Sequence, residues 1–209
     1  RLFAEGTFNA AFVPNYTSKL IKGKKQSNKF ANEVFNILFL VLLILTLIAQ
    51  IFMPVLVGLL APGFSENSEK IELATKLTRI TFPFLMLVCL SSFFSAILNS
   101  HNRFAAASAA PIILNVVLIV VLLFSKFLND ELVYYLSYGV SIGGLIQLIF
   151  LYKFVIEYYS PKFNFKIKLN KDIRLFFSKL LPSIFSSGVT QINILVGTII
   201  ASFQASAVS

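Results

Sequence analysis

The first sixteen residues of the chain hold several of the groups that could bind a ligand. Placed on a helix at about 100° per residue, they separate into two faces. The polar and aromatic face holds Arg1, Glu5, Phe8, Asn9, Phe12, Asn15 and Tyr16. The opposite face is small and apolar, and holds Leu2, Phe3, Gly6, Ala10, Val13 and Pro14. We expect the small face to pack against helices or lipid, and the polar face to meet water, a partner charge or a ligand.

Arg1 and Glu5 lie one helical turn apart on the polar face. One interpretation is a structural ion pair that lets the helix carry charge in a membrane. The other is a substrate site, because an arginine near the bilayer centre costs about 3 kcal/mol and such charges mark functional positions. A guanidinium group suits pyrophosphate, since its planar fork donates two parallel hydrogen bonds. We take Arg1, Glu5, Asn9 and Asn115 as candidate substrate-binding residues.

The remaining polar groups within apolar segments have a structural alternative. Asn115, Gln191 and Asn193 could form hydrogen bonds between helices, and Asn115 could also line a cavity. The residues that we expect to shape helices, as kinks, hinges or packing positions, are Gly6, Pro14, Pro83, Pro111, Gln191 and Asn193. The sequence has no phosphate-binding glycine loop, nucleophile elbow or histidine cluster, which favours a transporter over an enzyme.

The composition indicates a membrane protein with several spans. The chain has 209 residues, of which 57% are hydrophobic and 13% charged, and its mean hydropathy is +0.82. A soluble domain carries about 25% charged residues. A single Cys89 and a single His101 favour neither a disulfide framework nor a metal site. The net charge of +9 comes from short basic loops between apolar runs, a pattern of membrane topology rather than nucleic-acid binding.

Hydrophobic runs predict an all-α polytopic bundle. We expect membrane-crossing segments at about 1–18, 35–60, 80–98, 105–124 and 132–156, with a last span near 184–203 inside a 182–209 segment. Residues 19–29 are expected to form a basic loop, 61–64 a turn and 65–72 a surface segment. Residues 158–181 are expected to form a basic linker. Within this linker, we expect residues 171–180 to form an amphipathic helix at the membrane interface. Its lipid-facing side chains would be Ile173, Phe176, Phe177 and Leu180.

The distribution of positive charge predicts the orientation. Thirteen of the 18 Lys and Arg residues fall in 19–29, 99–104 and 153–181, whereas the alternate loops hold three. By the positive-inside rule, the three basic segments face the cytoplasm. Within the segment 132–156, Gly139-x-x-x-Gly143 has the spacing of close helix packing. Because the chain starts with Arg and its last residues lack an ending signal, we expect it to be part of a longer protein.

A series of short motifs occurs in order along the chain: Arg1-Leu-Phe-Ala-Glu-Gly-x-Phe-x-x-Ala-Phe-Val-Pro14, Ala61-Pro-Gly-Phe64, Ile80-Thr-Phe-Pro83, Ile97-Leu-Asn-x-x-Asn-Arg-Phe104, Ala110-Pro-x-x-Leu-Asn115, Gly143-Gly-x-x-Gln-Leu148, and Gln191-Ile-Asn193 with Ala201-Ser-Phe203. In this order, the motifs resemble those of the MurJ (MviN) lipid II flippase family of the multidrug/oligosaccharidyl-lipid/polysaccharide exporter superfamily. Together they cover essentially the whole chain.

The resemblance implies a fold of fourteen helices in two lobes. Residues 1–157 would then supply most of the amino-terminal lobe, and 182–209 the first helix of the second lobe. The resemblance also implies alternating access, with cavity arginines contacting pyrophosphate. Arg1 matches the second of two adjacent family arginines. Some members bind sodium through an acidic residue that aligns with Gly197 here, so no sodium site, other metal or cofactor is expected.

The predicted function is therefore the flipping of lipid II, or a related undecaprenyl-pyrophosphate-linked precursor, in cell wall biosynthesis. The expected location is the bacterial inner membrane, as a multi-pass protein, in contact with membrane lipids, without nucleic acid, and as a monomer. Two alternatives stay open: export of another lipid-linked oligosaccharide or a small molecule, and a non-transporting membrane scaffold. Drug-cation export would favour acidic cavity groups, and the spans contain no clear case of one.

Overall fold

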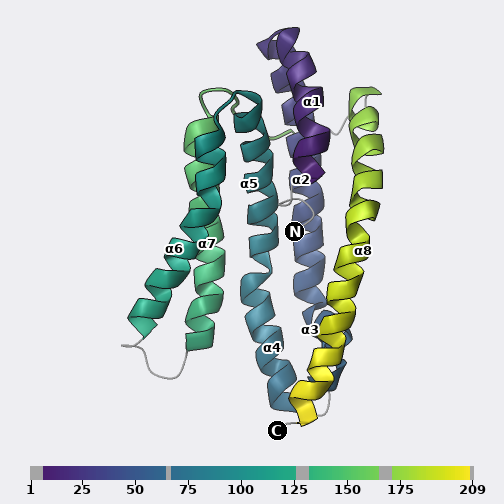
Figure 1. Ribbon diagram of the computed structural model, residues 1–209, viewed down its shortest axis with the longest axis vertical. Coiled ribbons are helices and arrows are strands. Elements are labelled where there is room, and N and C mark those ends of the chain that lie inside the picture. The colour runs from purple at the N-terminus through teal and green to yellow at the C-terminus, as the bar shows by residue number, and fades with distance from the viewer. Residues whose placement is uncertain (1–6, 65–66, 126–131, 165–170, 208–209) are drawn as a thin grey trace.

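The computed structural model describes residues 7–64, 67–125, 132–164 and 171–207, and these form helices joined by turns, with no strand among them (Figure 1). The predicted all-α class is confirmed. The elements are α1 Thr7–Ile21, α2 Lys24–Ile51, α3 Met53–Leu60, the short 3-10 helix η1 Pro62–Phe64, α4 Ser68–Thr81, α5 Pro83–Ser100, α6 Phe104–Ser125, α7 Leu132–Val155 and α8 Lys171–Ala207.

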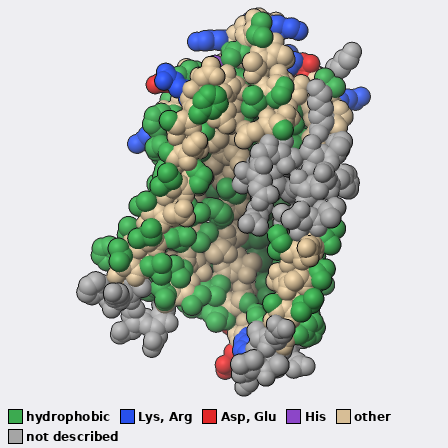
Figure 2. All heavy atoms as spheres, in the orientation of Figure 1, with side chains coloured by type: hydrophobic (Ala, Val, Ile, Leu, Met, Phe, Trp, Pro, Cys, Tyr) green, Lys and Arg blue, Asp and Glu red, His purple; other side chains and the backbone are tan. Residues whose placement is uncertain are grey.

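Long apolar helices make up most of the bundle. Four described segments are long and apolar enough to cross a membrane, namely 24–51, 68–100, 104–124 and 132–155, and Ile192–Phe203 is a shorter apolar stretch. Hydrophobic side chains cover much of the outer face in Figure 2. Because a helix satisfies its own backbone hydrogen bonds, this architecture suits a solvent of hydrocarbon. The polytopic membrane class predicted from the sequence is confirmed.

The basic connections lie together at one end of the bundle. The α1–α2 turn, the α5–α6 turn, the end of α7 and the start of α8 share the upper end in Figure 1. Lys and Arg side chains gather at the same end in Figure 2. The short helix η1 lies at the opposite end. The alternation of loops expected from charge therefore agrees with the fold, and the assignment of the basic end to the cytoplasm stays a prediction.

The basic segment 19–29 is almost entirely helical, so the loop predicted there was wrong. The break between α1 and α2 is confined to Lys22 and Gly23, and Gly23 has φ = 122°, a conformation that glycine adopts without strain. The helix α2 then begins eleven residues before the predicted span. Phe30, Ala31 and Val34 are buried along one face of this first part of α2. Polar residues between them lower the mean hydropathy of the segment, so a search for apolar runs does not find it.

Two further boundaries differ from the prediction. The segment expected at the surface becomes α4 from Ser68 onward, because the Asn67 side chain caps it by accepting hydrogen bonds from the amides of Glu69 and Lys70 at 3.1 Å each. The first long span, predicted as one segment over 35–60, is broken at Phe52, just before Pro54.

The core is an aromatic cluster in which α1, α2, α5 and α8 meet. Phe12 stacks on Phe8 and Phe30 at centroid distances of 5.3 and 5.7 Å, and meets the ring edges of Phe93 and Phe176 at 5.2 and 6.2 Å. The aromatic side of α1 is therefore buried, whereas Ala10 and Pro14 on the small side are exposed. The expectation that the polar and aromatic face meets water or a ligand was wrong for Phe8, Phe12 and Tyr16, because ring stacking offers a large contact area inside the bundle. The packing of the small side against lipid stays a prediction.

The proposed interfacial helix 171–180 is the beginning of α8, which continues without a break. Ile173, Phe176 and Leu180 are buried in the aromatic core rather than turned to lipid, so this expectation was wrong. Asp172 also forms an ion pair with Lys19 of α1 at 2.5 Å. An amphipathic pattern cannot distinguish lipid from a neighbouring apolar helix, since both are hydrocarbon surfaces.

Glycines allow α7 to pack closely on both of its neighbours. A Cβ added to Gly143 would lie 2.8 Å from the Cδ1 atom of Leu114 in α6, and one added to Gly144 would lie 2.5 Å from the Cδ2 atom of Phe84 in α5. Gly139 also faces α6, against Val121. The small-residue spacing predicted as a packing signal is therefore used for that purpose.

The basic end is fixed by a polar and aromatic contact network. The Tyr16 hydroxyl lies 3.1 Å from His101 Nε2, and the His101 ring stacks on Tyr158 at 4.3 Å. Arg103 donates from Nε to the Tyr158 hydroxyl at 2.7 Å. On the neighbouring surface, the Asn32 side chain accepts from the Tyr159 hydroxyl at 2.8 Å. These contacts hold α1, the α5–α6 turn and the end of α7 together.

Replacing Gly144 by leucine should separate α5 from α7. The new side chain has no room beside Phe84, and overpacking of this kind costs about 1–3 kcal/mol. We expect a lower melting temperature for the detergent-solubilised intact protein. Gly58→Leu is the matched control, because a Cβ at Gly58 meets nothing within 4 Å. Equal melting temperatures for the two variants would contradict this packing.

Stability should fall as the pH is lowered through the titration range of His101. Burial, and then the positive charge of Lys24, lower the pKa of His101 from its ordinary value of 6.5. The folded state therefore binds the proton less readily than the unfolded state, so stability is complete above pH 6.5 and decreases as the pH falls toward the lowered folded pKa. Melting temperatures measured at several pH values check this. Below pH 6.5, the melting temperature should fall less for His101→Asn than for the parent.

Candidate functional site

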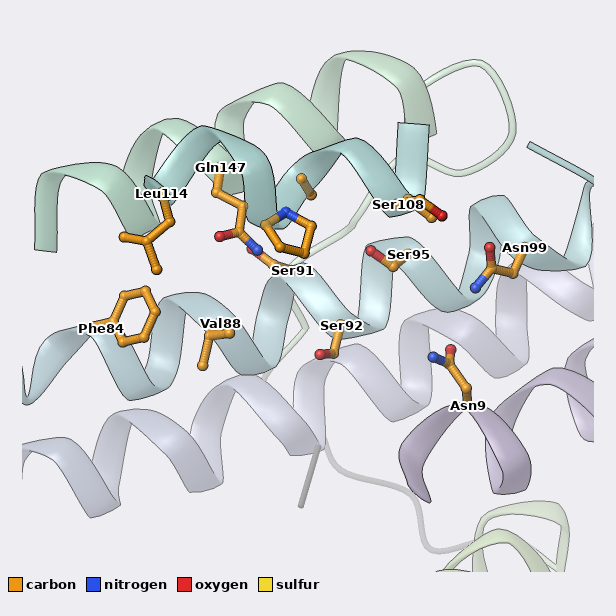
Figure 3. Close-up of a pocket in the computed structure, with 13 residues that line it drawn as sticks. Asn9, Phe84, Val88, Ser91, Ser92, Ser95, Asn99, Ser108, Leu114 and Gln147 are labelled. Carbon is orange, nitrogen blue, oxygen red and sulfur yellow. The ribbon is translucent and has the colours of Figure 1, made fainter. Parts of the chain in front are cut away.

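A polar cavity of about 280 Å³ lies between α1, α5, α6 and α7 (Figure 3). Its lining residues are Asn9, Phe84, Val88, Ser91, Ser92, Ser95, Asn99, Ala107, Ser108, Ala110, Pro111, Leu114 and Gln147. Seven of these have a hydroxyl or amide side chain and none is ionisable. The cavity therefore offers hydrogen bonds without charge.

Helix α5 supplies most of the polar wall. Ser91, Ser92, Ser95 and Asn99 follow one another at intervals of one, three and four residues, so they share one face of the helix. Figure 3 shows these side chains turned from α5 toward the space bounded by α1, α6 and α7. None of these four residues was predicted from the sequence to belong to the site. A hydroxyl stripe at helical spacing within an apolar span was the available signal.

Two buried oxygen atoms at the cavity have no hydrogen-bond partner among the described residues. They are Asn9 Oδ1 and Ser91 Oγ, and Ser91 has only 1% of its surface exposed. A buried polar atom without a partner costs about 1–3 kcal/mol. The amide oxygen can accept a hydrogen bond, and the hydroxyl can both donate and accept. Both atoms are therefore available to a ligand with hydroxyl or amide groups.

The predicted substrate-binding residues do not all lie at this cavity. Asn9 lines the cavity and lies opposite Asn99 in Figure 3. Asn115 is exposed on α6, one turn beyond Pro111, and is not part of the lining. Arg1 and Glu5 lie outside the described residues, and so does their proposed ion pair.

The predicted helix-shaping residues are also dispersed. Pro14 and Pro111 are inside α1 and α6, and Pro83 is the first residue of α5. Asn193 is exposed on α8. Gly6 and the Gln191 side chain lie outside the description. Within the described part of the chain, no group of three or more His, Cys, Asp or Glu side chains is placed to hold a metal ion.

The family model described as "Lipid II flippase MurJ" matches residues 1–209. A "Probable lipid II flippase MurJ" from Rickettsia prowazekii (strain Madrid E) is 36% identical over 211 residues, covering 100% of this chain and 41% of the relative. Another from Rhizobium tropici is 38% identical over 220 residues, covering 100% of this chain and 40% of the relative. The chain thus spans about two fifths of the length of these curated relatives.

The fold gives the same result. A solved structure titled "Lipid II flippase MurJ, inward closed conformation" superposes with a TM-score of 0.76 and 29% sequence identity, covering 97% of this chain and 41% of the other. The match of the family to every residue, the curated relatives and the shared fold confirm the resemblance noted from the motifs. The chain belongs to the MurJ lipid II flippase family.

Proposed function

We propose that this chain forms part of a transporter that moves the headgroup of lipid II across the bacterial inner membrane. The observation that carries the proposal is the uncharged polar cavity with two unpartnered buried oxygens inside an otherwise apolar bundle. A polar group within a membrane is costly, so a cavity that concentrates several of them is typical of a substrate path. Family membership supports lipid II over another exported molecule.

In this proposal the two parts of the headgroup meet different residues. The serine and amide side chains of α5, with Asn9 and Gln147, offer hydrogen bonds to sugar hydroxyl and acetamido groups. Arg1 and Glu5 are further proposed substrate-binding residues, with the Arg1 guanidinium bound to the pyrophosphate, because guanidinium binds such oxygens in a bidentate manner. The lipid tail stays in the bilayer throughout.

Transport then requires alternating access between two lobes. Residues 1–157 belong to the amino-terminal lobe, and α8, which begins at Lys171 and runs without a break to Ala207, contains the first helix of the second lobe. Rocking of one lobe against the other exposes the headgroup first to the cytoplasm and then to the outside. Pro14, Pro83 and Pro111, with Gly6, allow the helices to bend, whereas Gln191 and Asn193 join helices by hydrogen bonds. The protein acts as a multi-pass monomer and not as an enzyme.

Ser91→Ala should reduce flipping without reducing stability. The Ser91 hydroxyl has no hydrogen-bond partner among the described residues, so its removal relieves a buried polar group, but a bound headgroup would lose one hydrogen bond. One such bond corresponds to about a 2- to 10-fold loss of lipid II flipping by the intact protein. Flipping is measured in proteoliposomes, beside melting temperature.

Ser100→Ala is the matched control, because the Ser100 hydroxyl is also on α5 but donates to the Ala96 carbonyl and does not line the cavity. The control should flip lipid II at the parent rate. The assay must first show that the parent flips lipid II. If Ser91→Ala then flips lipid II at the parent rate, Ser91 is excluded from the headgroup site.

Arg1→Ala should weaken transport more strongly than Arg1→Lys. Loss of the guanidinium removes both charge and the bidentate geometry, whereas lysine retains the charge, and a charge-assisted hydrogen bond is worth about 1.5–3 kcal/mol. Complementation of a flippase-depleted strain by the intact protein measures the effect, with Glu5→Ala tested in parallel. If Arg1→Ala and Glu5→Ala both complement fully, the opening residues are only structural.

A further inference from the structure

The membrane segment formed by α4 and α5 is broken at Pro83. Residues 68–100 together are long and apolar enough to cross a membrane, and Figure 1 shows the two helices following one another along the bundle. Proline has no backbone N–H, so Pro83 cannot donate to the carbonyl four residues before it, which belongs to Arg79. Within a membrane, a carbonyl that loses its helical partner needs another donor.

The side chain of Gln50 supplies this donor. Gln50 Nε2 donates to the Arg79 carbonyl at 2.9 Å from the last turn of α2. Helix α2 is itself broken two residues later, at Phe52, just before Pro54. Two proline breaks in neighbouring helices are therefore joined by one amide side chain. This hydrogen bond replaces, between two helices, the bond that Pro83 removes within its own segment.

Helix α7 holds the other side of the same break. Ser141 Oγ donates to the Ile80 carbonyl at 2.5 Å, across 61 positions of the sequence. One turn further along α7, the missing side chain of Gly144 lets the Phe84 ring approach closely. The break is thus held from α2 by an amide and from α7 by a hydroxyl. We call Gln50 and Ser141 the Pro83 clamp.

The break lies directly beside the polar cavity. Phe84, the residue after Pro83, lines the cavity, and Ser91 follows on the same face of α5 two turns later. On α7, Gln147 lines the cavity one turn beyond Gly144. Figure 3 shows Phe84 and Gln147 turned toward the same space from the two helices. The angle at the break therefore sets how the hydroxyl face of α5 lies relative to Gln147.

We propose that Gln50 and Ser141 are positioning residues for the headgroup site. By donating to the carbonyls of Arg79 and Ile80, they hold the break at the angle that directs the hydroxyl face of α5 into the cavity. Pro83 alone creates the bend but does not fix it, because it removes a hydrogen bond and adds none. The proposal deepens the proposed transport function and rests on it for the identity of the ligand.

The first test is a double-mutant cycle between Gln50 and Pro83 in the detergent-solubilised intact protein. Gln50→Leu leaves the Arg79 carbonyl without its donor, so we expect a melting temperature lower by about 2 °C or more. In Pro83→Ala, the new amide at position 83 can donate to that carbonyl. Gln50→Leu should then leave the melting temperature unchanged. Equal losses in the two backgrounds would overturn the clamp.

Gln26→Leu is the matched control for this cycle. Gln26 is also on α2, its side chain is exposed, and it forms no hydrogen bond with the described part of the chain. The same chemical change at this position should leave the melting temperature unchanged in both backgrounds. A loss in Gln26→Leu equal to that in Gln50→Leu would show a general effect of leucine on α2 and would overturn the clamp.

The second test measures equilibrium binding of fluorescently labelled lipid II to the intact protein, at a temperature where every variant is folded. Gln50→Leu and Ser141→Ala should each weaken binding about 2- to 10-fold, the equivalent of one hydrogen bond. Ser141→Thr should bind as the parent does, because threonine retains the hydroxyl. Ser137→Ala is the control, since the Ser137 hydroxyl is on α7 but donates within its own helix, to the Val133 carbonyl.

The two tests separate this proposal from the proposed function. Parent-level binding by both Gln50→Leu and Ser141→Ala would overturn the positioning role while the parent still binds lipid II. A failure of Ser141→Thr to restore binding would also overturn it, because the hydroxyl would then not be the group that acts. If the parent itself does not bind lipid II, the proposed function fails and the positioning role fails with it, whereas the melting temperatures still decide whether Gln50 replaces the bond that Pro83 removes.

Discussion

The packing of aromatic rings around Phe12 is the interaction on which the rest of the structure depends. In a bilayer, burial of apolar surface gives little driving force between helices, because lipid is as apolar as the protein core. Shape and ring contacts must supply it instead. Phe12 brings together rings from α1, α2, α5 and α8, including Phe93 and Phe176. The orientation of α1 follows from this cluster, and so does the position of Asn9 beside the hydroxyl face of α5.

The same cluster makes the two ends of the bundle unequal. At the basic end, stacked rings combine with the contacts of His101, Tyr158 and Arg103. At the opposite end, α8 meets the bundle through Gly63 and Ser202 beside an apolar crevice. The polar cavity lies between α1 and α5–α7, apart from the lining of this crevice.

Much of the fold was predictable from hydrophobic runs and charge, and the errors have a common cause. Lipid-spanning helices such as α6 and α7 appear as uniform apolar segments, so their extents were close to those observed. Helix ends outside the apolar run were missed. The start of α2 and the first turn of α4 depend on one buried face or one capping residue, Asn67. The cavity serines were not predicted, because a single hydroxyl in an apolar segment does not indicate a site. Only the fold of α5 shows that several of them line the same cavity.

The sequence by itself determined the class of protein, the alternation of its loops and, through ordered motifs, its family. These properties depend on composition and on local order, which need no knowledge of neighbours. Only the tertiary structure decided which face of α1 is buried, that 171–180 packs in the core, and that Ser91 lies at a cavity while Asn115 does not line it. The physical reason is that lipid and a neighbouring apolar helix select the same residues. Among the described residues, the opening stretch of the chain is therefore a helix packed in the core, with one residue, Asn9, at the cavity.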